Sequence, residues 1–217
     1  MSCKIDYQPA PNLLENRIVL VTGAGDGIGR AAALSYAQHG ATVILLGRTI
    51  AKLERVYDEI EAAGGPQPAI FPLNFEGATL KDFHDMAETL DKEFGRLDGL
   101  LHNAGLLGRI TPFEQYNPEL WQQVMQVNIN GPIWMTQALL PLLQASDDAS
   151  VILPPPALAA KVVPTGALTL CLSSPQRGLL RCWPTSWITS PISGLIRSTQ
   201  GQRAPKCGVP RFPEKIL

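Results

Sequence analysis

The 217-residue sequence contains no apolar run long enough to cross a bilayer, and its first residues lack the apolar core of a secretory leader. We therefore expect a cytoplasmic protein with no membrane partner. A large net charge is also missing, because 18 basic and 19 acidic side chains leave −1, which gives no electrostatic reason to bind nucleic acid. Only four cysteines are present, and their spacing fits neither paired metal ligands nor a disulfide framework, so we expect reduced thiols and no metal site.

Acidic side chains are scarce near the end of the chain. Residues 1–150 hold 10 basic and 18 acidic side chains, whereas residues 151–217 hold eight basic ones and a single acid. The second stretch also holds ten of the 19 prolines, and three consecutive prolines at 154–156 remove backbone donors that a strand needs. We predict a domain over residues 1–153, followed by an irregular, proline-rich basic tail over residues 154–217 that adds no strands to it.

Strand-like and helix-like segments alternate through the domain. Buried strands are predicted at 17–22, 42–46, 69–73, 99–102 and 150–153, and helices at 28–39, 52–63, 80–94 and 118–143. This alternation predicts right-handed crossovers and an α/β fold. We expect a Rossmann-like doubly wound parallel sheet, truncated after about its fifth strand, with ligands at the carboxyl ends of the strands.

A glycine-rich turn joins the first predicted strand to the first predicted helix, with the sequence TGAGDGIG at residues 22–29. Glycine permits a sharp turn and a close approach of the backbone to a pyrophosphate, and the helix that follows offers free N–H groups to that anion. Because the glycines stand between a strand and a helix, we predict a dinucleotide site. Its residues are Thr22, Gly23, Asp26, Gly27, Ile28 and Gly29.

The second predicted strand lacks the terminal acidic residue that accepts hydrogen bonds from the ribose hydroxyls of NAD. Its end has the sequence LGRT at residues 46–49, so Arg48 stands near the place of the acid. A guanidinium group can pair with the 2′-phosphate of NADP, although a solvated arginine at a strand–helix junction is a simple alternative. The missing acid favours NADP over NAD.

These features, together with HNAG at residues 102–105 and Asn128 in the last predicted helix, resemble the short-chain dehydrogenase/reductase family. The TGxxxGxG pattern of that family is matched in the glycine turn, and its NAG motif is matched at residues 103–105. Residues 101–108 and 137–143 look most similar to bacterial YciK-type oxidoreductases. The resemblance covers about residues 12–153.

The resemblance implies an NADP(H)-dependent oxidoreductase that transfers hydride to or from a small carbonyl or alcohol substrate. It implies that Asn103, Ala104 and Gly105 support the sheet and the cofactor ribose. Asn74 takes the place of an aspartate that the family has beside the adenine, and Phe75 follows it. Asn128 matches the asparagine of the family's Asn-Ser-Tyr-Lys catalytic tetrad.

The rest of that tetrad is missing. The tyrosines are Tyr7, Tyr36, Tyr57 and Tyr116, so no YxxxK motif follows the fifth predicted strand. Proton transfer in this family needs that phenol, and Lys161 supplies no mechanism without it. The sequence therefore predicts an inactive chain, and the alternative function is that of a catalytically dead nucleotide-binding or interaction protein.

A change of reading frame would explain the missing motif. Codons can be chosen for residues 166–174 so that the frame two bases on encodes GAYAVSKF, which contains YxxxK. The same offset permits serine codons across the three prolines at 154–156. We interpret the tail as a frameshifted translation of an intact family gene, and a genuine divergent extension is the alternative.

The resemblance also implies a homo-oligomer in the intact family, formed through the fourth and fifth helices. Only the first of these two helices is recognisable in this sequence. Without its neighbour, apolar residues of the helix would lack part of their cover, although some of them face the domain's own sheet, and we expect poor solubility or heterogeneous oligomers. These residues are Trp121, Val124, Met125, Trp134, Leu139 and Leu142.

Overall fold

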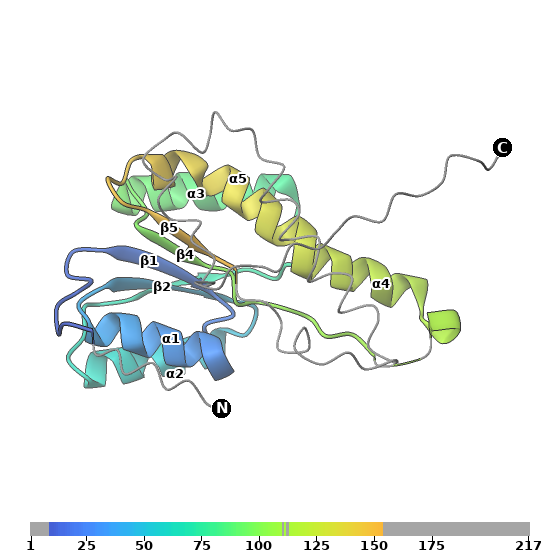
Figure 1. Cartoon of the computed structure of the whole chain (residues 1–217), viewed down its shortest axis with the longest axis horizontal. Helices are drawn as coiled ribbons and strands as arrows, with labels where there is room; N and C mark the ends of the chain where they lie inside the picture. The colour runs from blue at the N-terminus through green and yellow to red at the C-terminus, as the bar shows by residue number, and fades with distance from the viewer. Residues whose placement is uncertain (1–8, 110, 112, 154–217) are drawn as a thin grey trace, which may run out of the picture.

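The computed structural model describes residues 9–109, 111 and 113–153, and Figure 1 shows them as one sheet with helices on both sides. The predicted tail, residues 154–217, lies outside the described residues, so the predictions about its packing remain predictions. The strands are β1 (Ile18–Thr22), β2 (Thr42–Gly47), β3 (Ala69–Pro72), β4 (Gly99–Leu101) and β5 (Ser150–Ile152).

All strands of the sheet are parallel and lie in the order β3-β2-β1-β4-β5. The chain moves outward from β1 to β3 and then returns to place β4 on the other side of β1. The predicted doubly wound Rossmann-like sheet is therefore confirmed, with five strands in the described part of the chain. The loops that follow β1 and β4 meet where the strand order reverses, which is the ligand-binding edge of such sheets.

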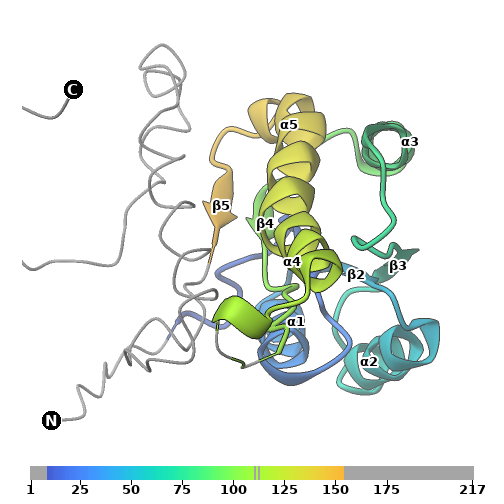
Figure 2. The same ribbon diagram turned by 90° about the vertical axis from the view of Figure 1, so that its right-hand side faces the viewer.

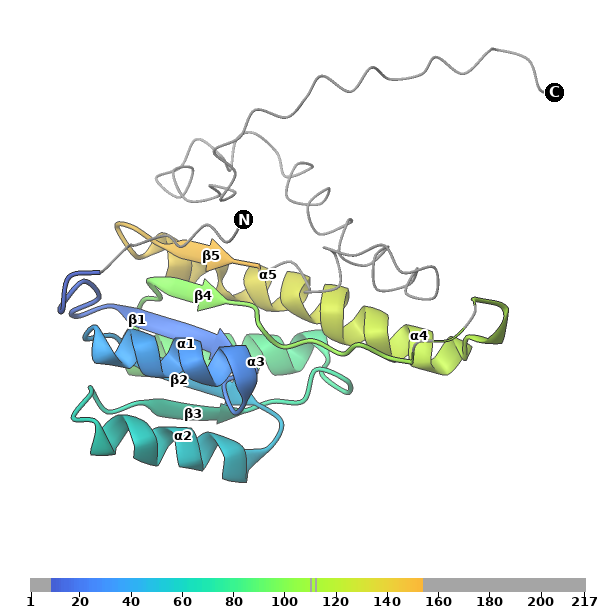
Figure 3. The same cartoon turned by 60° about the horizontal axis from the view of Figure 1, so that its bottom comes forward.

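Two layers of helices bury both faces of the sheet. α1 (Gly27–Gln38) and α2 (Ile50–Ala62) cover one face, and α3 (Leu80–Phe94) and α5 (Gly131–Gln144) cover the other, as Figures 2 and 3 show. Successive strand side chains point to opposite faces, so Val19 and Val21 join the α1–α2 core while Leu20 joins the α3–α5 core. This double burial explains why the strands are continuous apolar runs.

The helix predicted over residues 118–143 is divided into three parts. α4 (Pro118–Met125) and α5 are separated by a π-helical turn at Gln126–Asn130, and a short 3₁₀ turn at Phe113–Gln115 precedes them. Pro132 has no backbone N–H to donate to a carbonyl of the preceding turn, which favours a local widening of the helix at this point. Figure 3 shows α4 extending beyond the ends of the strands.

The buried Asp98 anchors the opposite edge of the sheet. It accepts hydrogen bonds from the Ser146 hydroxyl at 2.6 Å, the backbone N–H of Ile18 at 2.8 Å and the Arg17 guanidinium at 3.2 Å. Burial alone would raise the pKa of Asp98, but these hydrogen bonds outweigh it and lower the pKa below the ordinary value. The contacts fix β1, the start of β4 and the end of α5 relative to one another.

No helix in the described residues is long and apolar enough to span a membrane. Within the same residues, no cluster of three or more histidine, cysteine or acidic side chains is arranged to hold a metal ion.

Candidate functional site: a glycine turn and two cations at the carboxyl edge

The glycine turn at the end of β1 leaves open space where a ligand could approach the backbone. Gly23 and Gly27 have positive φ angles of 66° and 53°, which glycine adopts without strain. A Cβ atom on Gly27 would meet no other atom within 4 Å, so this part of the turn is uncovered. Beside it, the Ile28 side chain is 71% exposed at the amino-terminal end of α1. The arrangement suits a phosphate group placed against the turn and the helix N-terminus.

The NAG residues after β4 are fastened to this turn. The Asn103 side-chain amide donates to the Gly23 carbonyl at 3.4 Å, and the Ala104 N–H donates to the Thr22 hydroxyl at 2.9 Å. A Cβ atom on Gly29 would collide with the Gly23 carbonyl and lie 2.5 Å from the Asn103 amide. Glycine at position 29 is therefore a packing requirement, and the structure brings both predicted motifs together as one unit.

Two basic side chains lie at the start of α2, and each is paired with a carboxylate. Arg48 Nη1 lies 2.9 Å from Glu76 Oε1, and Lys52 Nζ lies 2.7 Å from Asp26 Oδ2. Asp26 is the N-cap of α1, and its pKa is lowered by hydrogen bonds from Lys52 and from the Gly27 N–H. The sequence analysis identified Arg48 and Asp26 but missed Lys52 and Glu76.

The residues after β3 lie beside Arg48 because Gly47 at the end of β2 pairs with Pro72 at the end of β3. Asn74 Oδ1 accepts a hydrogen bond from the Glu76 N–H at 3.2 Å. The Phe75 side chain is only 4% exposed and packs edge-on against Phe83 in the core. Only the backbone of Phe75 can therefore face a ligand, and the adenine contacts expected of Asn74 and Phe75 remain predictions.

Asn128 lies in the π-helical turn and clamps the loop that follows the NAG motif. Its side chain accepts from the Leu106 N–H at 2.8 Å and donates to the Leu106 carbonyl at 2.9 Å. A Cβ atom on Gly105 would lie 3.5 Å from Asn128 Oδ1, so the loop passes close to this side chain. The contacts give Asn128 a positioning role, while its part in proton transfer remains a prediction.

Comparison with known proteins identifies the family of this chain. The family model for short chain dehydrogenases matches residues 17–153. The chain belongs to this family. The uncharacterized oxidoreductase YciK of Escherichia coli (strain K12) is 51% identical over 146 residues, which cover 67% of this chain and 58% of that relative. The chain thus spans less than two thirds of the length of this relative.

Solved structures of other short chain dehydrogenases agree with the fold. The structure of the oxidoreductase YciK from E. coli matches with a TM-score of 0.81 and 41% identity, covering 86% of this chain and 76% of that one. A short chain dehydrogenase from Shigella flexneri 2a (strain 301), complexed with NADP, matches with a TM-score of 0.75 and 42% identity. That match covers 78% of this chain and 71% of the Shigella chain. The predicted similarity to YciK-type oxidoreductases is confirmed.

His102, directly before the NAG motif, is buried between β4 and α5. Its Nε2 lies 2.8 Å from the Thr136 hydroxyl, which itself donates to the Pro132 carbonyl at 2.7 Å. Because the threonine hydrogen is used in that bond, His102 Nε2 must carry the hydrogen that it shares with Thr136. His102 Nδ1 has no hydrogen-bond partner among the described residues, and burial lowers the pKa of His102 to about 4.

We expect this histidine to destabilise the domain in acid. The pKa of His102 lies below the ordinary value of 6.5, so the unfolded chain binds a proton first, and the stability present above pH 6.5 is lost as the pH falls toward 4. In the His102→Gln variant, the side-chain amide can take the place of Nε2 as hydrogen-bond donor, and it does not bind a proton in this pH range. Between these two pH values the unmodified chain should lose roughly 3 kcal/mol more unfolding free energy than the variant, measured by urea denaturation.

The exposed His84→Gln substitution on α3 is the matched control, and its pH dependence should follow that of the unmodified chain. If the unmodified chain and His102→Gln lose stability in parallel across this pH range, His102 is not the group that titrates.

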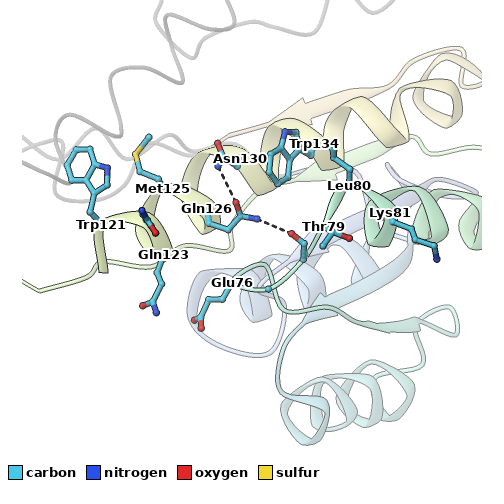
Figure 4. Close-up of a pocket in the computed structure, with 13 residues that line it drawn as sticks. Glu76, Thr79, Leu80, Lys81, Trp121, Gln123, Met125, Gln126, Asn130 and Trp134 are labelled. Carbon is cyan, nitrogen blue, oxygen red and sulfur yellow. Dashed lines mark hydrogen bonds between the residues drawn. The ribbon is translucent and has the colours of Figure 1, made fainter. Parts of the chain in front are cut away.

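An open pocket of about 830 Å³ lies away from the glycine turn, between the start of α3 and the α4–α5 segment (Figure 4). The Gln126 amide crosses it, donating to the Ala78 carbonyl at 3.0 Å and accepting from Asn130 at 3.2 Å. Trp121 and Trp134 form part of its wall. None of the predicted cofactor residues lines this pocket. We therefore do not assign it as the dinucleotide site.

The apolar residues named on the last helix divide into two groups. Val124, Leu139 and Leu142 are at most 4% exposed, and they are among those that face the protein's own core. Trp134 is partly buried and stacks edge-on against Phe83. Of the named residues, only Trp121, Met125 and Trp134 retain partial exposure, and all three line the pocket.

Proposed function

We propose that the described domain binds NADP(H) as the dinucleotide-binding part of a short-chain oxidoreductase. The observation that carries this proposal is the position of Arg48, a 65% exposed guanidinium at the end of β2 where NAD-preferring folds place an acid. Its planar fork of donors can grip a phosphate with two hydrogen bonds. Lys52 adds a second positive charge one helical turn further on.

The glycine turn fits the remainder of the cofactor. The uncovered backbone at Gly27 and the amino-terminal end of α1 would receive the pyrophosphate. Asn103, fixed against the Gly23 carbonyl, would support the ribose. The Shigella flexneri relative was solved with NADP, and its likeness to this chain supports the same cofactor here. The cofactor would supply or accept the hydride.

The reaction of the intact family member would be hydride exchange between the nicotinamide and a small carbonyl or alcohol. In this chain, Asn128 holds the loop after the NAG motif in place. Asn128 cannot act as the proton donor, because an amide does not titrate near neutral pH. No tyrosine follows Tyr116 in the sequence. That observation favours the second candidate for the chain as written, a nucleotide-binding protein without turnover.

Isothermal titration of the full chain with nucleotides tests the proposed cofactor. NADPH should bind more tightly than NADH because only NADPH offers the 2′-phosphate to Arg48. The fragment 2′,5′-ADP should retain most of the affinity, since the residues that we assign to the cofactor lie mainly on its adenine side. Nicotinamide mononucleotide serves as the control and should bind weakly. Equal affinity for NADPH and NADH, or no binding of either, would refute the proposal.

A further inference from the structure

Arg48 is already engaged by a carboxylate that the sequence did not reveal. Its Nη1 atom donates to Glu76 Oε1 at 2.9 Å, and the Glu76 side chain is 34% exposed. No acidic residue directly follows β2, but Glu76 reaches this place from the loop after β3, the neighbouring strand. The ion pair therefore bridges the two loops that form the adenine end of the proposed cofactor site.

The conformation of the β3–α3 loop directs Glu76 toward Arg48. The Glu76 N–H donates to Asn74 Oδ1, and the Gly77 N–H donates to the Asn74 carbonyl at 3.3 Å, so Asn74 organises the turn. Glu76 is one of the residues that line the pocket, and Figure 4 shows its carboxylate pointing away from Thr79 and Gln126. Its charge acts at the Arg48 side of the loop.

The second cation, Lys52, is also engaged by a carboxylate. Lys52 is paired with Asp26 at 2.7 Å, so Arg48 and Lys52 are each already paired with a carboxylate. A dianionic phosphate that approaches Arg48 must therefore share the guanidinium with Glu76 or displace that carboxylate. A bound NAD(H) would have a 2′-hydroxyl group at this place instead. That hydroxyl can donate a hydrogen bond to a carboxylate.

We propose that Glu76 sets the cofactor preference by competing with the 2′-phosphate of NADP(H) for Arg48. This inference rests on the proposed function of the site. Glu76 lowers affinity for the phosphorylated cofactor, through occupation of the guanidinium and repulsion of the phosphate, and leaves affinity for the unphosphorylated cofactor nearly unchanged. The site thus discriminates between NADP(H) and NAD(H) less than Arg48 alone would allow.

The test compares Glu76→Gln with the unmodified full chain by isothermal titration, using 2′,5′-ADP and 5′-AMP as probes. These probes differ in the 2′-phosphate and avoid the nicotinamide end of the site. The variant should bind 2′,5′-ADP roughly fivefold more tightly, as expected for one charge removed at a solvated distance of a few ångströms. Its affinity for 5′-AMP should change by less than about twofold, and the gain should shrink in high salt.

Glu93→Gln, on the exposed end of α3, is the matched control because it removes the same charge far from Arg48. This control should bind both probes as the unmodified chain does. In an Arg48→Ala background, Glu76→Gln should improve binding of 2′,5′-ADP by much less than in the unmodified chain, because only the direct repulsion between Glu76 and the phosphate is then removed. A gain of the same size in both backgrounds would overturn competition for Arg48.

The outcomes separate the two proposals. If the unmodified chain binds 2′,5′-ADP but Glu76→Gln binds it equally or more weakly, the inference about Glu76 is wrong and the proposed cofactor stands. If the unmodified chain binds neither probe, the proposed function fails, and the role of Glu76 fails with it.

Discussion

The full chain supplied with NADPH and a panel of aldehydes and ketones is expected to show no carbonyl reduction above background. Proton transfer in short-chain dehydrogenases requires a positioned tyrosine, and this sequence has no tyrosine after Tyr116. General acid–base catalysis typically contributes about 10²–10⁴-fold to a rate. The family resemblance also implies a lysine four residues after that tyrosine that would hold the nicotinamide ribose, and its absence should lower the rate further. The measurement is NADPH oxidation followed by absorbance, with the carbonyl omitted as the blank.

The matched comparison is the protein translated in the alternative frame after Leu153. On our interpretation of the tail as a frameshifted translation, that frame should restore the serine and the YxxxK motif together, and carbonyl reduction should return with them. Turnover by the chain as written would contradict this account. Tyr116, whose hydroxyl is buried without a partner among the described residues, would then be the first acid to test, through Tyr116→Phe.

Replacing Arg48 with alanine should weaken NADPH binding by about 1–3 kcal/mol, which corresponds to roughly 5- to 150-fold in dissociation constant. The loss would come from the proposed charged hydrogen bonds between the guanidinium and the 2′-phosphate. NADH lacks that phosphate, so its affinity should change little. Isothermal titration of both nucleotides on both proteins gives the comparison.

Lys92→Ala is the control for charge alone, because Lys92 is exposed in the last turn of α3, far from the glycine turn. It should leave the affinities for NADPH and NADH unchanged. Equal losses for the two cofactors in Arg48→Ala would show that Arg48 supports the site in general and does not recognise the phosphate.

Local patterns were sufficient to predict the sheet, the helices and the glycine turn. Each strand is a short apolar run, and each crossover has a helical period, so element order and handedness follow from neighbouring residues. The contact between Asn103 and the Gly23 carbonyl was also foreseeable, because both motifs end adjacent strands at the point where the strand order reverses. The division of the last helix was not predicted, since it depends on a π-helical turn.

The pairing of side chains at the site depends on register between separate segments, which sequence periodicity does not reveal. Glu76 reaches Arg48 only because β2 and β3 end side by side, and Lys52 reaches Asp26 only because α2 begins beside the glycine turn. The same limitation applies to Val124. The sequence shows that its helical face is apolar, but it does not show which residues cover that face.

The central claim is that the chain binds NADP(H) but does not transfer a proton to a substrate. Its most direct test is a single titration of the full chain with NADPH, in which nicotinamide fluorescence and absorbance are followed together. Fluorescence should change saturably as the nucleotide binds, and 2′,5′-ADP should reverse that change. Addition of the carbonyl panel should then leave the NADPH absorbance constant. Absence of saturable binding, or oxidation of NADPH after the carbonyl is added, would contradict the account.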